Sequence, residues 1–218
     1  CNCVYVDGAL NINSSAAYKN GLYTLQNTSS MAAAETLDPK PGELVLDMCA
    51  APGGKTTYIS ELMQNSGRVR AFDIHPHKIE LINSAAKRLG ISIIEAEVND
   101  ASVLKTDLIG MADRVLADVP CSGIGVIHKK PDIKWRRTAE DIPELCRIQY
   151  KILCNAAEYV KTGGTLVYST CTILKEENEE QTRRFLKEHT AYCLEEERTL
   201  QTFETGGSGF YIAKFRHA

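Results

Sequence analysis

Short apolar runs alternate with amphipathic segments along most of the chain. An apolar run of about four to eight residues between turn residues is typical of a buried strand, whereas apolar residues three or four positions apart indicate one face of a helix. The first pattern predicts strands at 43–48, 68–74, 91–98, 113–119, 165–171, 191–197 and 209–216. The second predicts helices at 29–36, 55–64, 76–90, 139–161 and 176–189. Strands and helices therefore alternate.

The residues between these segments support the assignment. Pro76 stands at the start of one predicted helix and Gly90 at its end, which is the usual pattern of helix boundaries. The sequence KTGG at 161–164 is expected to end the long helix before it. Alternating strands and helices predict a parallel sheet with right-handed crossovers, and the last two strands are expected to pair antiparallel. The predicted fold class is a doubly wound, Rossmann-like α/β domain, mostly parallel with an antiparallel C-terminal strand, whose ligands bind at the carboxyl ends of the strands.

The first forty residues do not follow this alternation. We interpret residues 1–40 as an extension or lid leading into the core and residues 41–218 as one catalytic domain. Within the extension, NTSSMAAAETL at 27–37 offers Asn, Thr and Ser as capping residues for the helix at 29–36. No internal repeat or low-complexity tract divides the rest of the chain.

Composition narrows the class of protein. The chain has 218 residues, 44% of them hydrophobic and 24% charged, with a formal net charge of −3, which is the balance of a globular protein that does not wrap nucleic acid with its whole surface. We expect no membrane span and no secretory signal, and therefore a cytoplasmic protein, which we expect to be a monomer. The eight cysteines lack CxxC pairs or clusters with histidine, so we expect free thiols and no metal site.

The loop after the first predicted strand favours a ligand. It reads DMCAAPGGKT, in which small residues and two glycines allow a backbone to approach a ligand closely before a helix begins. Asp73 ends the second strand about twenty residues further on, a position that suits a ribose diol, although it could instead cap the helix at 76–90. Asp100 follows the third strand and could accept from an exocyclic amine or cap a turn. The loop itself could also be an ordinary strand-to-helix turn.

Two thiols and a carboxylate follow the fourth and fifth predicted strands. Asp118 and Cys121 lie in DVPCSG, and Cys171 lies in STCT. Neighbouring strand ends would bring them into one cleft. A buried, inert thiol is the commoner role of a free cysteine. That interpretation fits Cys146, Cys154 and Cys193 better than it fits the two thiols at strand ends.

A basic segment lies between these two motifs. HKKPDIKWRR at 128–137 combines positive charge with the single tryptophan of the chain, which suits single-stranded nucleic acid. A solvated charged loop is the alternative. The candidate RNA-binding residues are Lys129, Lys130, Lys134, Trp135, Arg136 and Arg137.

Four motifs together resemble the Nol/Nop/Sun family of RNA cytosine-5 methyltransferases. They are LDMCAAPGGKT, DVPCSGIGVIHKKPDIKWRR, GGTLVYSTCTILKEENE and GSGFYIAKF, in this order. The resemblance implies a class I S-adenosylmethionine-dependent methyltransferase fold, formation of 5-methylcytosine in small-subunit ribosomal RNA, and S-adenosylmethionine as cofactor. It implies that the family's N-terminal RNA-binding domain is absent here. The family's Gln-Asp pair is Gln26-Asn27 in this chain, to which we assign no role.

The resemblance also assigns roles to single residues. Asp73 would bind the ribose hydroxyls, Asp100 would lie near the adenine amine, and Asp118 would lie between the methionine end of the cofactor and the target base. The implied cofactor loop consists of Cys49, Ala50, Ala51, Pro52, Gly53, Gly54 and Lys55.

Carbon 5 of cytosine is a poor nucleophile until a thiolate adds to carbon 6, so the reaction needs an accessible thiolate and a group that handles the developing charge at N3. Asp118 is the candidate for N3 and would have to be protonated at that step. Analogy with DNA cytosine-5 methyltransferases makes Cys121 the nucleophile. Resemblance to the RNA family instead makes Cys171 the nucleophile and gives Cys121 a part in release.

Three alternatives remain at this point. The same chemistry could act on transfer RNA. The chain could be a non-catalytic module that binds S-adenosylmethionine and RNA, although both thiols and Asp118 are present. It could also be a dinucleotide oxidoreductase, against which the lack of a GxGxxG motif weighs.

Overall fold

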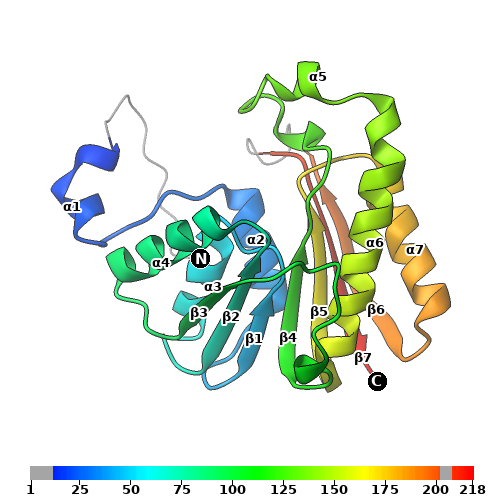
Figure 1. Cartoon of the computed structure of the whole chain (residues 1–218), viewed down its shortest axis with the longest axis horizontal. Coiled ribbons are helices and arrows are strands. Elements are labelled where there is room, and N and C mark those ends of the chain that lie inside the picture. The colour runs from blue at the N-terminus through cyan, green and yellow to red at the C-terminus, as the bar shows by residue number, and fades with distance from the viewer. Residues whose placement is uncertain (1–11, 202–207) are drawn as a thin grey trace.

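The computed structural model describes residues 12–201 and 208–218, which form a seven-stranded sheet with helices on both faces (Figure 1). The strands are β1 (Leu44–Asp47), β2 (Arg68–Asp73), β3 (Ile94–Val98), β4 (Ala112–Asp118), β5 (Val160–Thr170), β6 (Tyr192–Leu200) and β7 (Phe210–His217). The α-helices are α1 (Ala16–Lys19), α2 (Thr28–Leu37), α3 (Gly54–Leu62), α4 (Pro76–Leu89), α5 (Ile133–Arg136), α6 (Ile142–Tyr159) and α7 (Glu179–Glu188). Single 3₁₀ turns are η1 (Ile12–Ser14), η2 (Thr106–Leu108), η3 (Ile124–Val126), η4 (Ala139–Asp141) and η5 (Lys175–Glu177).

The sheet has the strand order β3-β2-β1-β4-β5-β7-β6. Strands β1 to β5 are parallel to one another, whereas β7 runs antiparallel to both β5 and β6. The predicted doubly wound, mostly parallel sheet with an antiparallel C-terminal strand is therefore confirmed. The chain order reverses between β1 and β4, which lie side by side, and such a switch point opens a crevice at the carboxyl ends of the strands.

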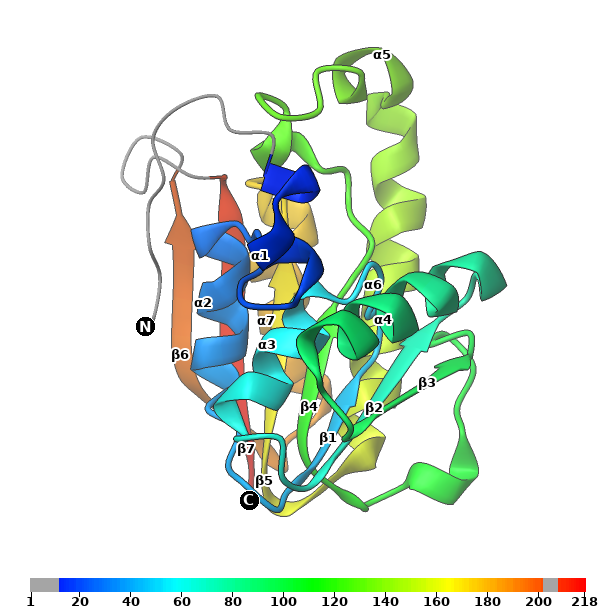
Figure 2. The ribbon, with the colours of Figure 1, turned by 90° about the vertical axis from the view of Figure 1, so that its left-hand side faces the viewer.

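Helices cover both faces of the sheet, and successive side chains along each strand pack against opposite faces. Val45 of β1 packs in the cluster that includes α2 and α3, while the next residue, Leu46, packs in the cluster that includes α6 and α7. Val115 and Leu116 of β4 alternate in the same way. Figure 2 shows α2, α3 and α4 in front of the sheet, with α6 and α7 on the far side. The continuous apolar runs in the sequence follow from this burial on both faces.

The prediction of a helix over 139–161 ended by KTGG is wrong at both ends. The chain makes the single turn η4 first, and α6 stops at Tyr159. Val160 already belongs to β5 and pairs with Ala112, while Thr165 pairs with Arg114, so residues 161–164 form a bulge within the strand. Glycines inside a strand commonly mark such a bulge, and Gly163 has a φ of 75°. The glycines therefore interrupt a strand and do not end the helix.

The helix boundaries at α2 and α4 follow the predicted capping chemistry. The side chain of Asn27 accepts from the backbone N–H of Ser29 and caps α2. Pro76 opens α4, and Gly90 follows it with a φ of 69° in the left-handed region, which suits glycine. Among the described residues, no helix combines the length and apolar character needed to cross a membrane.

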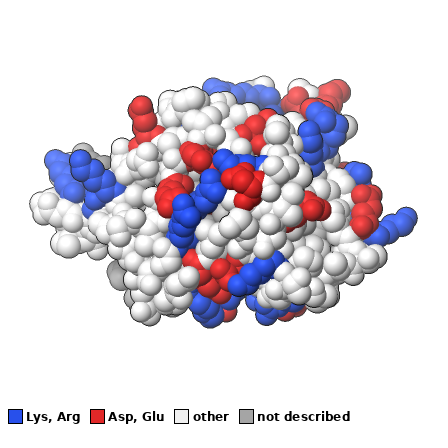
Figure 3. Space-filling model, turned by 60° about the horizontal axis from the view of Figure 1, so that its bottom comes forward, with Lys and Arg blue, Asp and Glu red and all other residues white. Residues whose placement is uncertain are grey.

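The amino ends of the strands carry charged side chains of both signs. Figure 3 shows Lys and Arg interspersed with Asp and Glu on this face. Arg114 of β4 pairs with Glu43 at 2.6 Å and also donates to the carbonyl of Leu37, and both charged side chains are largely buried. Arg68 and Glu95 form an exposed pair at 2.6 Å. Charge at this end of the sheet is therefore balanced locally.

Candidate active site

Three strands end in aspartate at the same edge of the sheet. Asp47, Asp73 and Asp118 are the last residues of β1, β2 and β4. Because parallel strands place their carboxyl ends together, this edge gathers acidic side chains. Asp100 joins them from the loop that follows β3.

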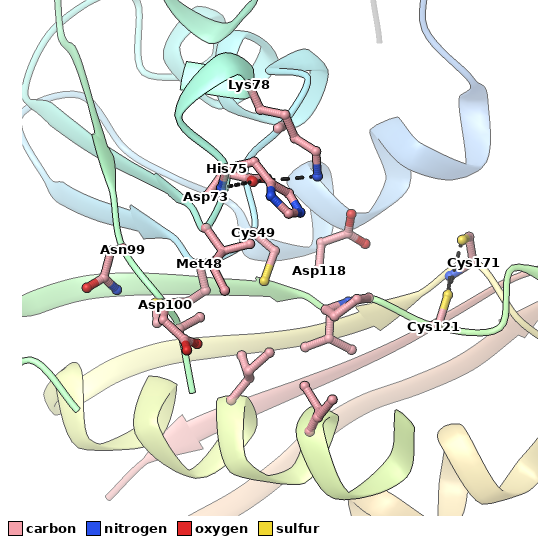
Figure 4. Close-up of a pocket in the computed structure, with 17 residues that line it drawn as sticks. Met48, Cys49, Asp73, His75, Lys78, Asn99, Asp100, Asp118, Cys121 and Cys171 are labelled. Atoms are coloured by element: carbon pink, nitrogen blue, oxygen red, sulfur yellow. Dashed lines mark hydrogen bonds and ion pairs between the residues drawn. The ribbon is translucent and has the colours of Figure 1, made fainter. Parts of the chain in front are cut away.

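A cavity of about 340 Å³ opens at this edge (Figure 4). Asp73, Asp100 and Asn99 lie toward one end of it, Cys121 and Cys171 lie at the other end, and Asp118 lies between them. Apolar side chains complete the walls. The lining residues are Met48, Cys49, Ala51, Asp73, Ile74, His75, Lys78, Asn99, Asp100, Ala101, Asp118, Val119, Pro120, Cys121, Ile148, Ile152 and Cys171.

The glycine-rich loop connects β1 to α3 next to this cavity. Of its seven candidate residues, Cys49 and Ala51 line the cavity, while Ala50 is buried in a small core cluster beside Ile82. Gly53 has a φ of 104°, and a Cβ there would lie 3.2 Å from the Cα of Ile82 in α4. Glycine suits this position because it adopts a positive φ without strain and has no Cβ to crowd Ile82. Pro52, Gly53 and Gly54 thus shape the loop and do not line the cavity.

Lys55, the second residue of α3, extends to the other motif. Its Nζ lies 2.7 Å from Oδ2 of Asp118 and 5.2 Å above the ring centre of Phe210. The other carboxylate oxygen of Asp118 accepts from the hydroxyl of Ser169 at 2.8 Å. The loop after β1 and the end of β4 are therefore joined by a largely buried ion pair.

Asp73 and Asp100 both make local turn contacts while facing the cavity. Asp73 Oδ1 accepts from the backbone N–H of His75 at 3.0 Å and lies 3.5 Å from Nζ of Lys78. His75, and not Asp73, occupies the N-cap position of α4, so the interpretation of Asp73 as the helix cap is wrong. Asp100 Oδ1 accepts from the backbone N–H of Ser102 at 2.8 Å, which is the turn-capping alternative.

The structure brings Cys121 and Cys171 together. Their Sγ atoms lie 3.1 Å apart, and the backbone N–H of Cys171 donates to Sγ of Cys121 at 3.3 Å. The hydrogen bond from Cys121 holds the pKa of Cys171 below its ordinary value, with help from the positive charges of Lys55 and Lys130. The same hydrogen bond, together with burial, raises the pKa of Cys121 well above its ordinary value. Of the two thiols, Cys171 is therefore the one that ionises more readily.

Cys49 lines the same cavity, whereas three other described cysteines lie outside it. Cys146 and Cys154 lie on α6 as expected and are half-buried. The expectation that Cys193 is buried is wrong, because it lies exposed on β6, a strand at the edge of the sheet. All six cysteines in the described ranges are free thiols.

The predicted basic segment projects beyond the carboxyl edge of the sheet, where α5 is seen in Figure 1. Trp135 is 82% exposed, and Nζ of Lys134 lies 5.4 Å from its ring centre. Arg136 pairs with Asp132 at 3.3 Å on the surface. Lys129, Lys130 and Arg137 are exposed as well. The segment therefore presents positive charge and an aromatic ring to solvent near the thiol end of the cavity.

Four buried polar residues were missed from the sequence. Asp47, Gln149, Glu177 and Asn178 are all nearly or fully inaccessible to solvent. Burial raises the pKa of Asp47 to about 7, against the lowering effect of the hydrogen bond from Thr56. Glu177 and Asn178 belong to the acidic run KEENE, which has the appearance of a solvated helix start. Its position directly after the STCT loop was the only available clue.

The strand order, the single antiparallel strand and a cavity at the switch point define a class I methyltransferase fold. TrmN from Thermus thermophilus shares this fold with a TM-score of 0.64 at 20% identity, over 87% of this chain and 48% of that chain. Residues 34–216 match the family model described as 16S rRNA methyltransferase RsmB/F, and the chain belongs to this family.

Several relatives cover most of the chain. The probable ribosomal RNA small subunit methyltransferase B of Bacillus subtilis is 50% identical over 79% of this chain and 39% of its own length. The corresponding protein of Sodalis glossinidius is 41% identical over 94% of this chain and 48% of its own. The structure of NSun6 from Pyrococcus horikoshii has a TM-score of 0.88 at 32% identity, over 96% of this chain and 56% of that chain. The chain thus spans about half the length of the curated relatives it matches.

Proposed function

We propose that this chain methylates carbon 5 of a cytosine in small-subunit ribosomal RNA through a covalent bond between Cys171 and the base. The observation that carries this proposal is the pair of thiols 3.1 Å apart at the edge of a cavity that also contains Asp118. Membership of the RsmB/F family supports the reaction and the class of RNA.

The polar and apolar side chains that line the cavity suit S-adenosylmethionine. Carboxylates of Asp73 and Asp100 face one end, where ribose hydroxyls and an adenine amine can donate to them. Apolar side chains such as Ile148 and Ile152 line a wall that suits an aromatic ring. Asp118 lies between this end and the thiols, where the methionine part would lie. When bound, S-adenosylmethionine supplies an electrophilic methyl group on sulfur.

Attack begins at Cys171. Its thiolate forms a bond to carbon 6 of cytosine, and the electron pair of the C5–C6 double bond moves toward N3. Asp118 meets the charge that develops at N3 and has to carry a proton at that step, which requires its ion pair with Lys55 to open. Carbon 5 is then nucleophilic enough to take the methyl group. The lowered pKa of Cys171 supports its choice as the attacking group.

Release of the methylated RNA requires the bond between carbon 6 and the sulfur of Cys171 to break. A base removes the proton from carbon 5, the electron pair restores the C5–C6 double bond, and the C6–S bond breaks to return the Cys171 thiolate. N3 gives its proton back to Asp118, so the product is neutral 5-methylcytosine. Cys121 assists this step because its thiol can donate a hydrogen bond to the departing sulfur across 3.1 Å. The raised pKa of Cys121 supports this role, since a donor must keep its proton.

The RNA is proposed to contact the exposed basic segment. Lys129, Lys130, Lys134, Arg136 and Arg137 supply charge for phosphates, and Trp135 offers a face for stacking. The target base has to leave its stack to reach the thiols. We propose that the protein acts as a monomer in the cytoplasm.

The test is methyl transfer from S-adenosylmethionine to unmodified small-subunit ribosomal RNA and to unmodified transfer RNA, with the modified position mapped. The proposal expects 5-methylcytosine at one position of the ribosomal RNA. Transfer to transfer RNA alone would support the same chemistry on the other substrate. Binding of S-adenosylmethionine without transfer to either RNA would show a non-catalytic module. Titration with NAD in parallel separates the oxidoreductase alternative.

A further inference from the structure

Two consecutive side chains behind the thiols are completely buried although both are polar. Glu177 ends the turn η5 and Asn178 follows it, and neither is accessible to solvent. Neither residue lines the cavity. A buried carboxylate is costly unless its hydrogen bonds are well satisfied, so a fold that retains one uses it for a definite purpose.

Glu177 holds the segment that carries Cys121. Its Oε1 accepts from the backbone N–H of Ser122 at 2.8 Å and from Nε2 of Gln149 at 2.8 Å, while its Oε2 accepts from the Ser122 hydroxyl at 2.5 Å. The same Nε2 of Gln149 donates to the carbonyl of Pro120 at 3.0 Å. The residues on both sides of Cys121 are thereby fixed to one carboxylate and its amide neighbour.

Asn178 holds the segment that carries Cys171. Its Oδ1 accepts from the Thr170 hydroxyl at 2.6 Å, and its Nδ2 donates to the carbonyl of Thr172 at 3.1 Å. The residues on both sides of Cys171 are therefore fixed to one amide. A hydrogen bond of 2.9 Å between the hydroxyls of Ser122 and Thr172 links the two segments directly behind the thiols.

We infer that Glu177 and Asn178 are positioning residues that divide the work between the two thiols, Glu177 placing Cys121 for release and Asn178 placing Cys171 for attack. This inference rests on the proposed function, in which the two thiols have different tasks. Asn178 bonds to both neighbours of Cys171, whereas Glu177 bonds directly to Ser122 and reaches Pro120 through Gln149. Neither side chain bonds to a neighbour of the other cysteine, so the division is built into the hydrogen-bond pattern.

The experiment compares Glu177→Ala and Asn178→Ala with Cys121→Ala and Cys171→Ala. Each variant is incubated with ribosomal RNA and S-adenosylmethionine, and the covalent adduct is measured on a denaturing gel. Glu177→Ala is expected to accumulate adduct as Cys121→Ala does, whereas Asn178→Ala is expected to lose adduct as Cys171→Ala does. Turnover is expected to fall on the order of 10²-fold in both, the cost of displacing a reacting group by about 1 Å.

Three further variants separate positioning from folding. Glu177→Gln keeps an acceptor for Ser122 N–H and Gln149 and can donate to the Ser122 hydroxyl, so it is expected to restore most of the release. Thr170→Val removes only the hydroxyl that bonds to Asn178 and is expected to reduce attack. Glu176→Ala removes an exposed carboxylate one residue away and is expected to match the unmodified chain in adduct and turnover.

A measurement without RNA tests whether Glu177 and Asn178 position the two thiols, independently of the proposed reaction. The alkylation rates of Cys121 and Cys171 by iodoacetamide are followed by mass spectrometry in the folded variants. Glu177→Ala is expected to change the rate at Cys121 more than at Cys171, and Asn178→Ala the reverse. Equal changes at both thiols, or loss of adduct in Glu177→Ala, would overturn the inference. Absence of adduct in Cys121→Ala itself would instead count against the proposed function, and the alkylation rates would still decide the inference.

Discussion

The two ends of one sheet use charge in opposite ways. At the amino ends of the strands, Arg114 is paired with Glu43 and charged groups of both signs alternate over the surface (Figure 3). At the carboxyl ends, Asp47 is buried with its Oδ1 lacking a hydrogen-bond partner, and Glu177 is buried among neutral donors. Balanced charge stabilises a fold, whereas buried acids reduce stability and are retained where they serve chemistry. The comparison predicts that substitutions at the two ends have different consequences.

The largest effect is expected from Cys171→Ala at the carboxyl end. Removing the attacking thiol should lower methyl transfer on the order of 10⁴-fold or more, while the melting temperature stays close to that of the unmodified chain. Methyl transfer and thermal unfolding are measured on the same preparation. Cys193→Ala, which removes an exposed thiol on β6, is the matched control and should leave both unchanged.

Asp47→Asn tests whether the carboxyl end reduces stability. The folded-state pKa of Asp47 is raised from 3.8 to about 7, so its ionisation destabilises the fold as pH rises through this range. Between pH 5 and pH 8 the unmodified chain should lose about 3 kcal/mol of unfolding free energy that Asp47→Asn does not lose. Denaturant unfolding at both pH values checks this. An identical pH dependence in the two proteins would contradict the raised pKa of Asp47.

The basic segment also belongs to the carboxyl end. Changing Lys129, Lys134 and Arg137 to Glu should weaken RNA binding on the order of 10²-fold and reduce the slope of log K against log salt by about 0.7 for each lost phosphate contact. Binding is titrated at several salt concentrations. The control is a second triple variant with the same change in charge on other exposed surfaces. It changes Lys40, Lys87 and Lys187 to Glu. Equal weakening by both triple variants would return the segment to the solvated-loop interpretation.

The smallest effect is expected at the amino end. Arg114→Met removes a largely buried ion pair and the bond to Leu37, which should lower the unfolding free energy by about 1–3 kcal/mol without changing methyl transfer. Arg68→Met breaks an exposed pair and should leave the unfolding free energy nearly unchanged. Loss of methyl transfer in folded Arg114→Met would contradict the view that the amino ends of the strands serve stability alone.

Much of the sheet and of the site follows from the sequence because strand ends in a doubly wound fold are predictable. The apolar runs place Asp73, Asp118 and Cys171 at carboxyl ends, and resemblance to a family adds the choice between the thiols. The limits of helix α6 could not be predicted, because the pairing of Val160 with Ala112 depends on a strand almost fifty residues earlier. Local glycines gave the opposite indication.

The buried acids could not be predicted for a different reason. KEENE is charged enough to be solvated, and only tertiary packing places Glu177 against Ser122 and Gln149. The exposure of Cys193 likewise depends on β6 lying at the edge of the sheet. Hydrophobic pattern thus predicts which residues reach the site, while the polar contacts that hold them in place depend on segments distant in the sequence.

The central claim is that Cys171 attacks and Cys121 releases. The most direct measurement incubates Cys121→Ala and Cys171→Ala with RNA and S-adenosylmethionine, separates the products on a denaturing gel and identifies the cross-linked residue by mass spectrometry. The account predicts a stable adduct in Cys121→Ala, attached through Cys171, and none in Cys171→Ala. An adduct formed by Cys171→Ala but not by Cys121→Ala would contradict it and make Cys121 the nucleophile.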